Sequence, residues 1–391
     1  MSNIRPYTGV RILDGTWRLG RYATRLFADL GADVVRIEPP GGLPDRHITA
    51  LTNHNITDAD FAFSNASKRS VVIDTTVPEG RAQLDELAKG AQIIIAERGG
   101  ALFEELSRLR EVAPQAVVTF ISPYGLGGPD EASPASDLVL QAAGGIAWLS
   151  GRADGPPLRL PINQSSMITS VYAAAATAIA LFDSEERGRG HIIDVSAQEC
   201  IAHSLQNAIQ VWDLEKRVSR RGGEGTRDAS EDIFPCKDGY VFIATPPTLG
   251  VSWKSLVGWT KEVGHSAHEE FSQERWLDRK WRTTAEARGL FRQNFEAFIG
   301  DFTRAELASE AIARKIVMSP VARVCDLVDD EQLQYRGFFQ AVDNPHTHTS
   351  MRFPGAPYRL SEGVWDVSAA PELGEYGPDT PGAHDIKKTA V

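Results

Sequence analysis

The sequence predicts an α/β protein with a parallel, doubly wound sheet, and three observations support this fold class. Short runs of β-branched and aliphatic residues alternate with amphipathic helical stretches through the first half of the chain. These helical stretches are about 10–15 residues long, the length of a crossover between parallel strands. Helices dominate beyond residue 225, so a smaller, α-rich second domain is expected there.

The elements of the first half follow one another in a regular order. Strands are predicted at 10–13, 33–38, 70–74, 92–96 and 116–121, with helices at 21–30 and 78–89 between them. Gly31 and Gly90 end these two helices, as glycine often does. A long helix at 166–183, a strand at 191–195 and a helix at 197–212 follow. The helix at 166–183 is rich in alanine, which permits close backbone approach, so we expect it to pack against another helix.

The second half begins after a polar, glycine-containing segment at 217–231. A strand is predicted at 239–244, and helices at 252–263, 285–299 and 304–313. The tail from Pro345 onward is rich in proline and glycine and is expected to lie over the surface. These features predict a large domain at 1–224, a small domain at 225–335 and a segment at 336–391 that returns to the large domain.

Composition excludes several classes of function. The chain of 391 residues has a formal net charge of −11, which argues against a nucleic-acid binder. The most apolar stretch, 171–182, is about 12 residues long, whereas a membrane span needs about 20. Cys200, Cys236 and Cys325 lie far apart, as expected of reduced cysteines in a cytoplasmic protein.

No metal-ligand spacing is present, and His346 and His348 alone are not taken as a metal site.

The first strand–helix turn, Asp14–Gly20, lacks the GxGxxG pattern, so a nicotinamide or flavin cofactor has little support. Basic residues lie near the next strands, at Arg36, Lys68 and Arg69. Two interpretations of this basic group remain open, an anion site and a solvated strand edge.

Eight segments in order resemble the type III CoA-transferases, also called the carnitine-dehydratase and bile-acid-inducible family. They lie at 7–14, 22–41, 67–70, 136–145, 154–157, 188–196, 234–241 and 355–361. The resemblance implies a Rossmann-like large domain, a small domain inserted after it, and an interlocked dimer in which each chain threads the other. It also implies transfer of CoA from an acyl-CoA to a free carboxylic acid. A subgroup of the family racemises 2-methylacyl-CoA thioesters instead.

The resemblance also implies a nucleophilic aspartate at the start of the alanine-rich helix. Counted without gaps from the turn at 154–157, that position is Ser166, and no acid lies within 161–167. A serine hydroxyl would need a general base, and the chain lacks the GxSxG turn that presents a nucleophilic serine in other enzymes. As an alternative to a catalytic role, Ser165 or Ser166 is interpreted as a helix N-cap.

Further site residues come from the same resemblance. Arg18 is nearest the position that often carries a polar CoA contact, and Ile73 keeps the apolar character expected beside the adenine. Glu97 and Arg98 follow the fourth strand, where the family often has Glu-Asn-Phe to hold CoA. Glu97 would repel a phosphate and Arg98 would attract one.

Asp137 has two interpretations, a structural acid at a helix start and a catalytic group. In the racemases a histidine precedes this aspartate and a second aspartate occupies the Ser166 position. Here both positions are serine, Ser136 and Ser166, so a two-base racemase is disfavoured. Gly222 and Gly223 are interpreted either as the mobile glycine loop of the family's active site or as a plain linker.

The leading hypothesis is a subunit of a CoA-transferase, paired with a homologous chain that carries the aspartate. One alternative is an active acyl-CoA enzyme that uses a relocated acid, such as Asp137. Another is an acyl-CoA-binding protein without turnover. No permanently bound cofactor is expected, with CoA and acyl-CoA as substrates. The expected assembly is a homodimer or a heteromer with a homologous catalytic subunit, without nucleic acid or membrane.

Overall fold

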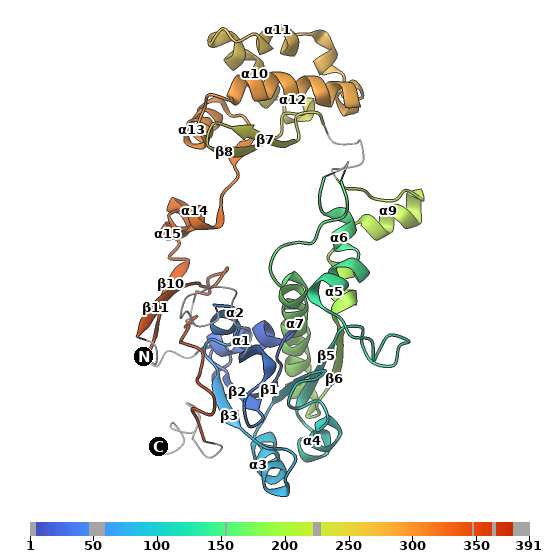
Figure 1. The fold of residues 1–391 in the computed structure, drawn as a ribbon, viewed down its shortest axis with the longest axis vertical. Helices are drawn as coiled ribbons and strands as arrows, with labels where there is room; N and C mark the ends of the chain where they lie inside the picture. Colours follow the sequence, from blue (N-terminus) through green and yellow to red (C-terminus); the bar gives the residue numbers. More distant parts are fainter. Residues whose placement is uncertain are drawn as a thin grey trace. The chain divides into compact units, whose positions relative to one another are not determined.

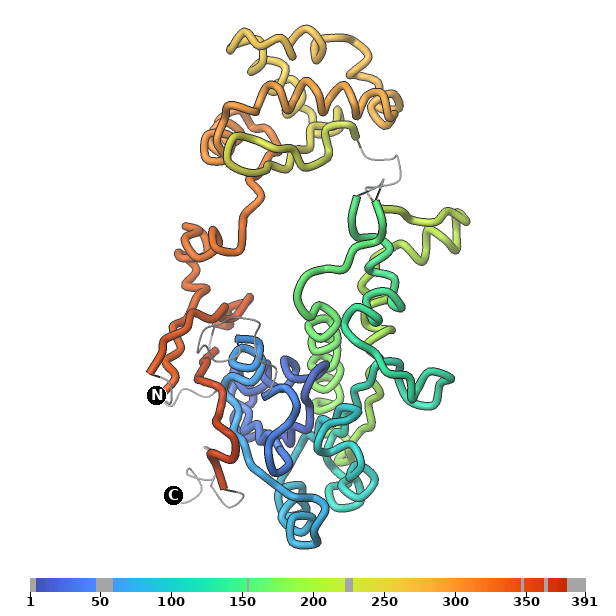
Figure 2. The backbone as a smooth tube through the Cα atoms, in the orientation of Figure 1, coloured from blue at the N-terminus to red at the C-terminus, as the bar shows by residue number. Residues whose placement is uncertain are grey.

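The computed structural model describes residues 5–46, 59–152, 155–221, 228–345, 348–361 and 365–377. The chain forms two compact units (Figures 1 and 2). The larger is built from residues within 1–151, 155–218 and 332–391, and the smaller from Arg152 and residues within 219–331. The domain boundaries stated from the sequence, after residues 224 and 335, stay a prediction.

The larger unit contains the first group of elements in chain order. They are β1 (Arg11–Gly15), α1 (Arg21–Asp29), β2 (Asp33–Glu38), η1 (Pro44–Arg46), α2 (Ala59–Ser64), β3 (Arg69–Val72), α3 (Pro78–Lys89), β4 (Ile93–Glu97), α4 (Leu106–Val112), β5 (Val117–Ser122), α5 (Asp137–Ala143), α6 (Ile146–Leu149), α7 (Gln164–Arg187), β6 (Ile192–Ser196), α8 (Ala197–His203) and α9 (Ala208–Glu215). After the smaller unit, α15 (Glu331–Tyr335), β10 (Phe339–Asn344) and β11 (Thr349–Pro354) follow.

The central sheet has six parallel strands in the order β3-β2-β1-β4-β5-β6, which confirms the predicted doubly wound sheet. Successive side chains of each strand point to opposite faces. Ile12 therefore joins a core with α1 and α7, whereas Leu13 joins a core with α3 and α4. The strand order reverses between β1 and β4, so the carboxyl ends of these two strands border the crevice where such sheets bind ligands.

Helix α7 packs against α1 and against β5, as its alanine content predicts (Figure 1). Its buried face also carries hydroxyl side chains, and the Thr177 Oγ1 lies 2.7 Å from the Thr119 Oγ1 of β5. By length and by a mean hydropathy of 1.5, α7 could cross a membrane. A core helix meets the same criteria, and the sheet contacts of α7 are those of a core helix.

Several features differ from the expected elements. Helix α7 begins at Gln164 after an N-cap at Asn163, so neither Ser165 nor Ser166 is the N-cap. The helix expected at 197–212 is divided into α8 and α9, because Gln206 between them has a left-handed φ of 57°. The tail contains an antiparallel hairpin, β10–β11, that was not predicted. Beyond the hairpin, residues 365–377 run beside β3, where the Tyr376 N–H donates to the Ser70 carbonyl at 3.1 Å.

The smaller unit is α-rich, with a small antiparallel sheet in the order β7-β8-β9. Its elements are β7 (Asp232–Cys236), β8 (Gly239–Ile243), η2 (Pro247–Leu249), α10 (Val251–Glu262), α11 (Ala267–Phe271), η3 (Glu274–Leu277), η4 (Trp281–Thr283), α12 (Ala285–Ile299), α13 (Arg304–Arg314), β9 (Met318–Pro320) and α14 (Val324–Val328). Aromatic side chains fill its core, and Arg282 is buried among them with its guanidinium over Trp253 and hydrogen-bonded to Asp228.

Candidate active site at the start of helix α7

Five of the six residues predicted for the site gather around the loop between β1 and α1. They are Arg18, Glu97, Arg98, Asp137 and Ser166, joined directly or through one intervening residue. Ile73 lies apart at the end of β3, two strands from β1 in the sheet, and is only 2% exposed. The structure therefore brings together residues that are far apart in sequence, at the strand-order reversal of the sheet.

The Glu97 carboxylate holds the β1–α1 loop. Its Oε2 accepts the backbone N–H groups of Trp17 and Arg18 at 3.0 Å and of Gly20 at 3.2 Å, and its Oε1 accepts that of Leu19 at 2.8 Å. Successive backbone N–H groups that converge in this way form an anion-binding nest. Here the anion is the chain's own carboxylate, which is 1% exposed. Glu97 shapes the loop, and its contact with CoA stays a prediction.

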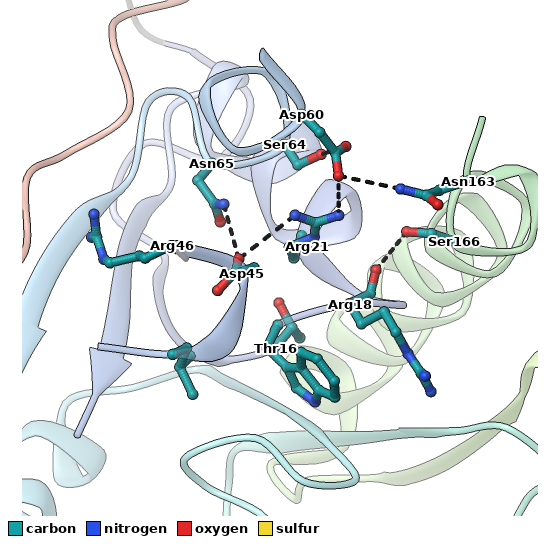
Figure 3. Close-up of polar contacts among 12 residues, drawn as sticks. Thr16, Arg18, Arg21, Asp45, Arg46, Asp60, Ser64, Asn65, Asn163 and Ser166 are labelled. Atoms are coloured by element: carbon teal, nitrogen blue, oxygen red, sulfur yellow. Dashed lines mark hydrogen bonds and ion pairs between the residues drawn. The ribbon is translucent and has the colours of Figure 1, made fainter. Parts of the chain in front are cut away.

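Ser166 lies in the first turn of α7 and faces the same loop (Figure 3). Its hydroxyl donates to the Arg18 carbonyl at 2.6 Å. One helical turn later, the Ser170 hydroxyl donates to the Leu19 carbonyl at 2.7 Å. These two serines dock α7 onto consecutive carbonyls, so the Ser166 proton is directed at an acceptor that is not a base.

Asp137 is the first residue of α5, and its carboxylate is directed at α7. Oδ1 accepts the Ser165 N–H at 2.9 Å, and Oδ2 accepts from the Gln141 side chain at 2.7 Å. The Ser165 hydroxyl also donates to the Asp137 carbonyl at 3.1 Å. An acceptor that binds a first-turn N–H stabilises a helix start. Asp137 thus makes the contacts of a structural acid, and its catalytic role stays a hypothesis.

The Arg18 side chain leaves the loop in the direction away from Ser166 (Figure 3). One terminal nitrogen donates to the Ala135 carbonyl, and the guanidinium lies 5.2 Å from the centre of the Trp17 ring. The side chain is half-buried, and its Nε has no hydrogen-bond partner. Arg18 therefore presents a cation at the edge of the site.

Arg98 lies on the other side of the loop, at the end of β4. Its guanidinium pairs with Glu131 at 2.9 Å and lies 4.9 Å from the centre of the Phe103 ring. Its carbonyl accepts the Trp17 indole N–H at 3.2 Å. The positive charge expected at this position is therefore present, with an acidic partner.

Both interpretations of the basic group near β2 and β3 are wrong for Arg36 and Lys68. Both side chains are completely buried in an internal ion network. Lys68 donates to Asp14 at 2.9 Å and to Asn65 at 2.9 Å, and Arg36 pairs with Asp45. The sequence does not show this network, because Asp14 lies 54 residues from Lys68 and no local pattern indicates that Asp45, nine residues from Arg36, folds back onto it. Arg69, by contrast, is partly exposed and pairs with Asp33 at 2.7 Å.

Burial and charge shift the pKa values in this network. Burial lowers the pKa of Lys68 to about 8, despite the opposing effect of Asp14. Burial alone would raise the pKa of Asp14, but Lys68 and Arg36 more than offset this effect, so the pKa of Asp14 is lowered. The two groups form an ion pair at neutral pH. Asp14 also accepts hydrogen bonds from the Thr16 N–H and hydroxyl, which ties the pair to the β1–α1 loop.

One bridge at the site was missed by sequence reasoning. Asp60 of α2 accepts from Arg21 of α1 at 2.7 Å and from Asn163, immediately before α7, at 3.2 Å (Figure 3). Three elements that are separate in sequence thus meet at one carboxylate. No local motif marks Asp60, because its partners lie about 40 and 100 residues away.

Some predicted features lie outside the described residues, namely Gly222, Gly223, His346 and Asp154 of the turn at 154–157. Within the described residues, no group of three or more His, Cys, Asp or Glu side chains could hold a metal ion.

Comparison with known proteins identifies the chain's family. Residues 7–376 match CoA-transferase family III. The chain is 34% identical over 384 residues to subunit BbsE of the succinyl-CoA:(R)-benzylsuccinate CoA-transferase of Thauera aromatica, with 95% of this chain and 92% of that protein covered. The chain belongs to CoA-transferase family III.

This family III chain has further relatives along most of its length. It is 27% identical over 347 residues to the alpha subunit of the succinyl-CoA–L-malate CoA-transferase of Chloroflexus aurantiacus, covering 86% of this chain and 79% of that one. A crystal structure of a CAIB/BAIF family protein from Brucella suis superposes with a TM-score of 0.82 at 23% identity, over 99% of both chains. That likeness confirms the fold. Membership of the family makes CoA and acyl-CoA the substrates to consider.

Proposed function

We propose that this chain is the non-nucleophilic subunit of a type III CoA-transferase and works with a homologous chain that carries the aspartate. One observation carries the proposal. Ser166 stands where the family's nucleophile is expected, and its hydroxyl donates to the Arg18 carbonyl. A carbonyl cannot remove the proton that a serine nucleophile must lose. Two relatives of the chain are themselves subunits, BbsE and the alpha subunit of the malate enzyme.

In the proposed complex the covalent steps take place on the partner's aspartate. Its carboxylate attacks the donor thioester, the C–S bond breaks, CoA leaves as a thiolate and a mixed anhydride forms. The thiolate then attacks the aspartyl carbonyl of the anhydride, which releases the donor acid and leaves an aspartyl-CoA thioester. The acceptor carboxylate attacks that thioester, and the same two steps in reverse give the acceptor's CoA ester. In this proposal the chain forms the dimer with its partner and shapes the pocket, and it makes no covalent bond to the substrate.

We propose dicarboxylic acids as the substrate class. The names of the two relatives contain succinyl, benzylsuccinate and malate, each of which is a dicarboxylic acid or derives from one. Arg18, Ile73 and Arg98 are proposed to contact CoA or its ester, with Glu97 holding the loop between them. The assembly is proposed to be an interlocked dimer in the cytoplasm, with domains at 1–224, 225–335 and 336–391.

Copurification and activity together test the proposal. The tagged chain is isolated from its own host, any homologous polypeptide that accompanies it is identified, and CoA exchange between succinyl-CoA and a carboxylic acid is measured. We expect no exchange by the chain alone and exchange by the two-chain complex. Exchange by the chain alone contradicts the proposal, and loss of that exchange in Asp137→Asn would then establish a relocated acid.

If the chain binds acyl-CoA but neither the chain alone nor the complex exchanges CoA, the acyl-CoA-binding alternative is favoured. Ser166→Asp provides a further comparison, because it restores the residue type expected for the nucleophile. Exchange by this variant alone would show that the site still admits CoA and lacks only the carboxylate.

A further inference from the structure

The arginines around the site differ in one respect, the presence of an acidic partner. Arg21 pairs with Asp60, Arg36 with Asp45, and Arg98 with Glu131. Among the described residues, Arg18 has no ion pair with any carboxylate. It is thus a half-buried cation without an internal counter-charge, which is unusual because a partly desolvated charge is costly unless it is compensated.

Hydrogen bonds fix both the backbone N–H and the backbone carbonyl of Arg18. Its N–H donates to Glu97 at 3.0 Å, and its carbonyl accepts from Ser166 at 2.6 Å. The side chain lies against Trp17 and donates to the Ala135 carbonyl. A guanidinium has five N–H donors, and this single hydrogen bond leaves donors for a ligand.

Neither of the two acids of the site, Glu97 and Asp137, forms an ion pair with the Arg18 side chain. Glu97 binds four backbone N–H groups of the loop, and Asp137 binds Ser165 and Gln141. The amino end of α7, a helix of 24 residues, adds partial positive charge beside the loop. The unpaired Arg18 guanidinium and the amino end of α7 are therefore the two groups here that would attract an anionic group of a ligand.

We propose that Arg18 binds the distal carboxylate of a dicarboxylic substrate, the carboxylate that is not joined to CoA. This inference rests on the proposed function. A guanidinium matches a carboxylate through two parallel N–H···O bonds, which makes arginine the suitable residue for this recognition. Arg18 then selects dicarboxylic over monocarboxylic acyl groups of equal length.

Calorimetric titration with two four-carbon acids tests the inference. Succinate and butyrate are titrated into the full-length chain and into the two-chain complex. We expect succinate to bind about tenfold or more tightly than butyrate, since a charge-assisted pair contributes at least that factor. Arg18→Gln should remove the preference for succinate, and Arg18→Lys should retain part of it. Arg81→Gln is the control and should retain all of it, because this substitution removes the same charge from α3, outside the site.

Equal binding of the two acids by the native protein overturns the inference, as does a preference that survives in folded Arg18→Gln. Binding of neither acid, by the chain or by the complex, also overturns it. Thermal unfolding of each variant verifies folding. Because binding requires no turnover, failure of this inference and failure of the proposed function can be distinguished. An active complex without an Arg18-dependent preference would retain the proposed function and reject the role of Arg18.

Discussion

At the scale of single residues, Ser166 serves as a hydrogen-bond donor in the fold. Its hydroxyl is fixed on the Arg18 carbonyl, in the same way that Ser170 is fixed on Leu19. Removal of such a donor leaves a partly buried carbonyl without its partner, which typically costs about 1 kcal/mol.

Ser166→Ala should therefore lower the free energy of unfolding by about 1 kcal/mol and leave CoA exchange by the two-chain complex largely intact. Denaturant unfolding and the exchange rate are the two measurements. Ser170→Ala is the matched control, because it removes an equivalent hydrogen bond one turn away. Loss of exchange in Ser166→Ala alone, with Ser170→Ala active, would show that the Ser166 hydroxyl takes part in the chemistry.

Asp29 provides a pH-dependent test of the buried charges. Its side chain is fully buried, and its Oδ2 lies 3.0 Å from the Arg25 Nε. Burial raises the pKa of Asp29 to about 6, although Arg25 and Ser67 oppose the rise. In the unfolded chain its pKa is near 4. Between about pH 4 and 6 the folded state binds more protons than the unfolded state, so this residue's contribution to stability falls as pH rises.

The free energies of unfolding of the native chain and Asp29→Asn should therefore differ by an amount that changes with pH. The native chain should lose roughly 2–3 kcal/mol relative to the variant between pH 4 and 6, with no further change above pH 7. Chemical unfolding at a series of pH values measures this difference. Parallel profiles for the two proteins would show that the pKa of Asp29 does not change on folding.

Site residues differ in how visible they are in the sequence. Resemblance alone proposes three of them: Ser166 by its distance from the turn at 154–157, Asp137 within a matching segment, and Arg18 as the residue nearest a family position across a one-residue deletion. The Asp60 bridge and the Lys68–Asp14 pair depend on how distant elements pack, and no local pattern encodes that packing. Arg36 was misjudged for a different reason. Its acidic partners, Glu38 and Asp45, are near in sequence, but a basic residue on a strand gives no indication that its side chain is buried.

At the scale of secondary-structure elements, strong periodicity and terminal signals were sufficient. Strand β2 and helices α3 and α12 have the predicted bounds, and α3 has proline in its first turn. The break between α8 and α9 was missed because Gln206 is a residue that seldom adopts positive φ. The β10–β11 hairpin was missed because proline and glycine suggested an irregular tail.

The β1–α1 loop depends on Glu97 more than on its own residues. Glu97→Ala removes the acceptor of four backbone N–H groups, so we expect a loss of on the order of 3 kcal/mol or more in the free energy of unfolding. Glu131→Ala is the control, since its partly exposed pair with Arg98 should contribute less than about 1 kcal/mol. Equal effects of the two substitutions in denaturant unfolding would contradict the role assigned to Glu97.

At the scale of the whole molecule, an exposed apolar surface on α7 favours assembly. Helix α7 is buried along one face, yet Val171, Ile179 and Phe182 on another are 52%, 71% and 69% exposed. A helix that is apolar on all sides is normally buried on all sides. The proposed interlocked dimer would cover such surface, and its interface should exceed the roughly 2,000 Å² of ordinary complexes.

The central claim is that the covalent intermediate forms on the partner chain and not on this one. The most direct test is mass spectrometry of the separated chains after the two-chain complex has been incubated with succinyl-CoA and quenched during turnover. We predict an aspartyl-CoA or acyl adduct on the partner and none on any peptide of this chain. An adduct on this chain, whether at Ser166, Asp137 or Asp60, would contradict the account and identify the residue that acts as the nucleophile.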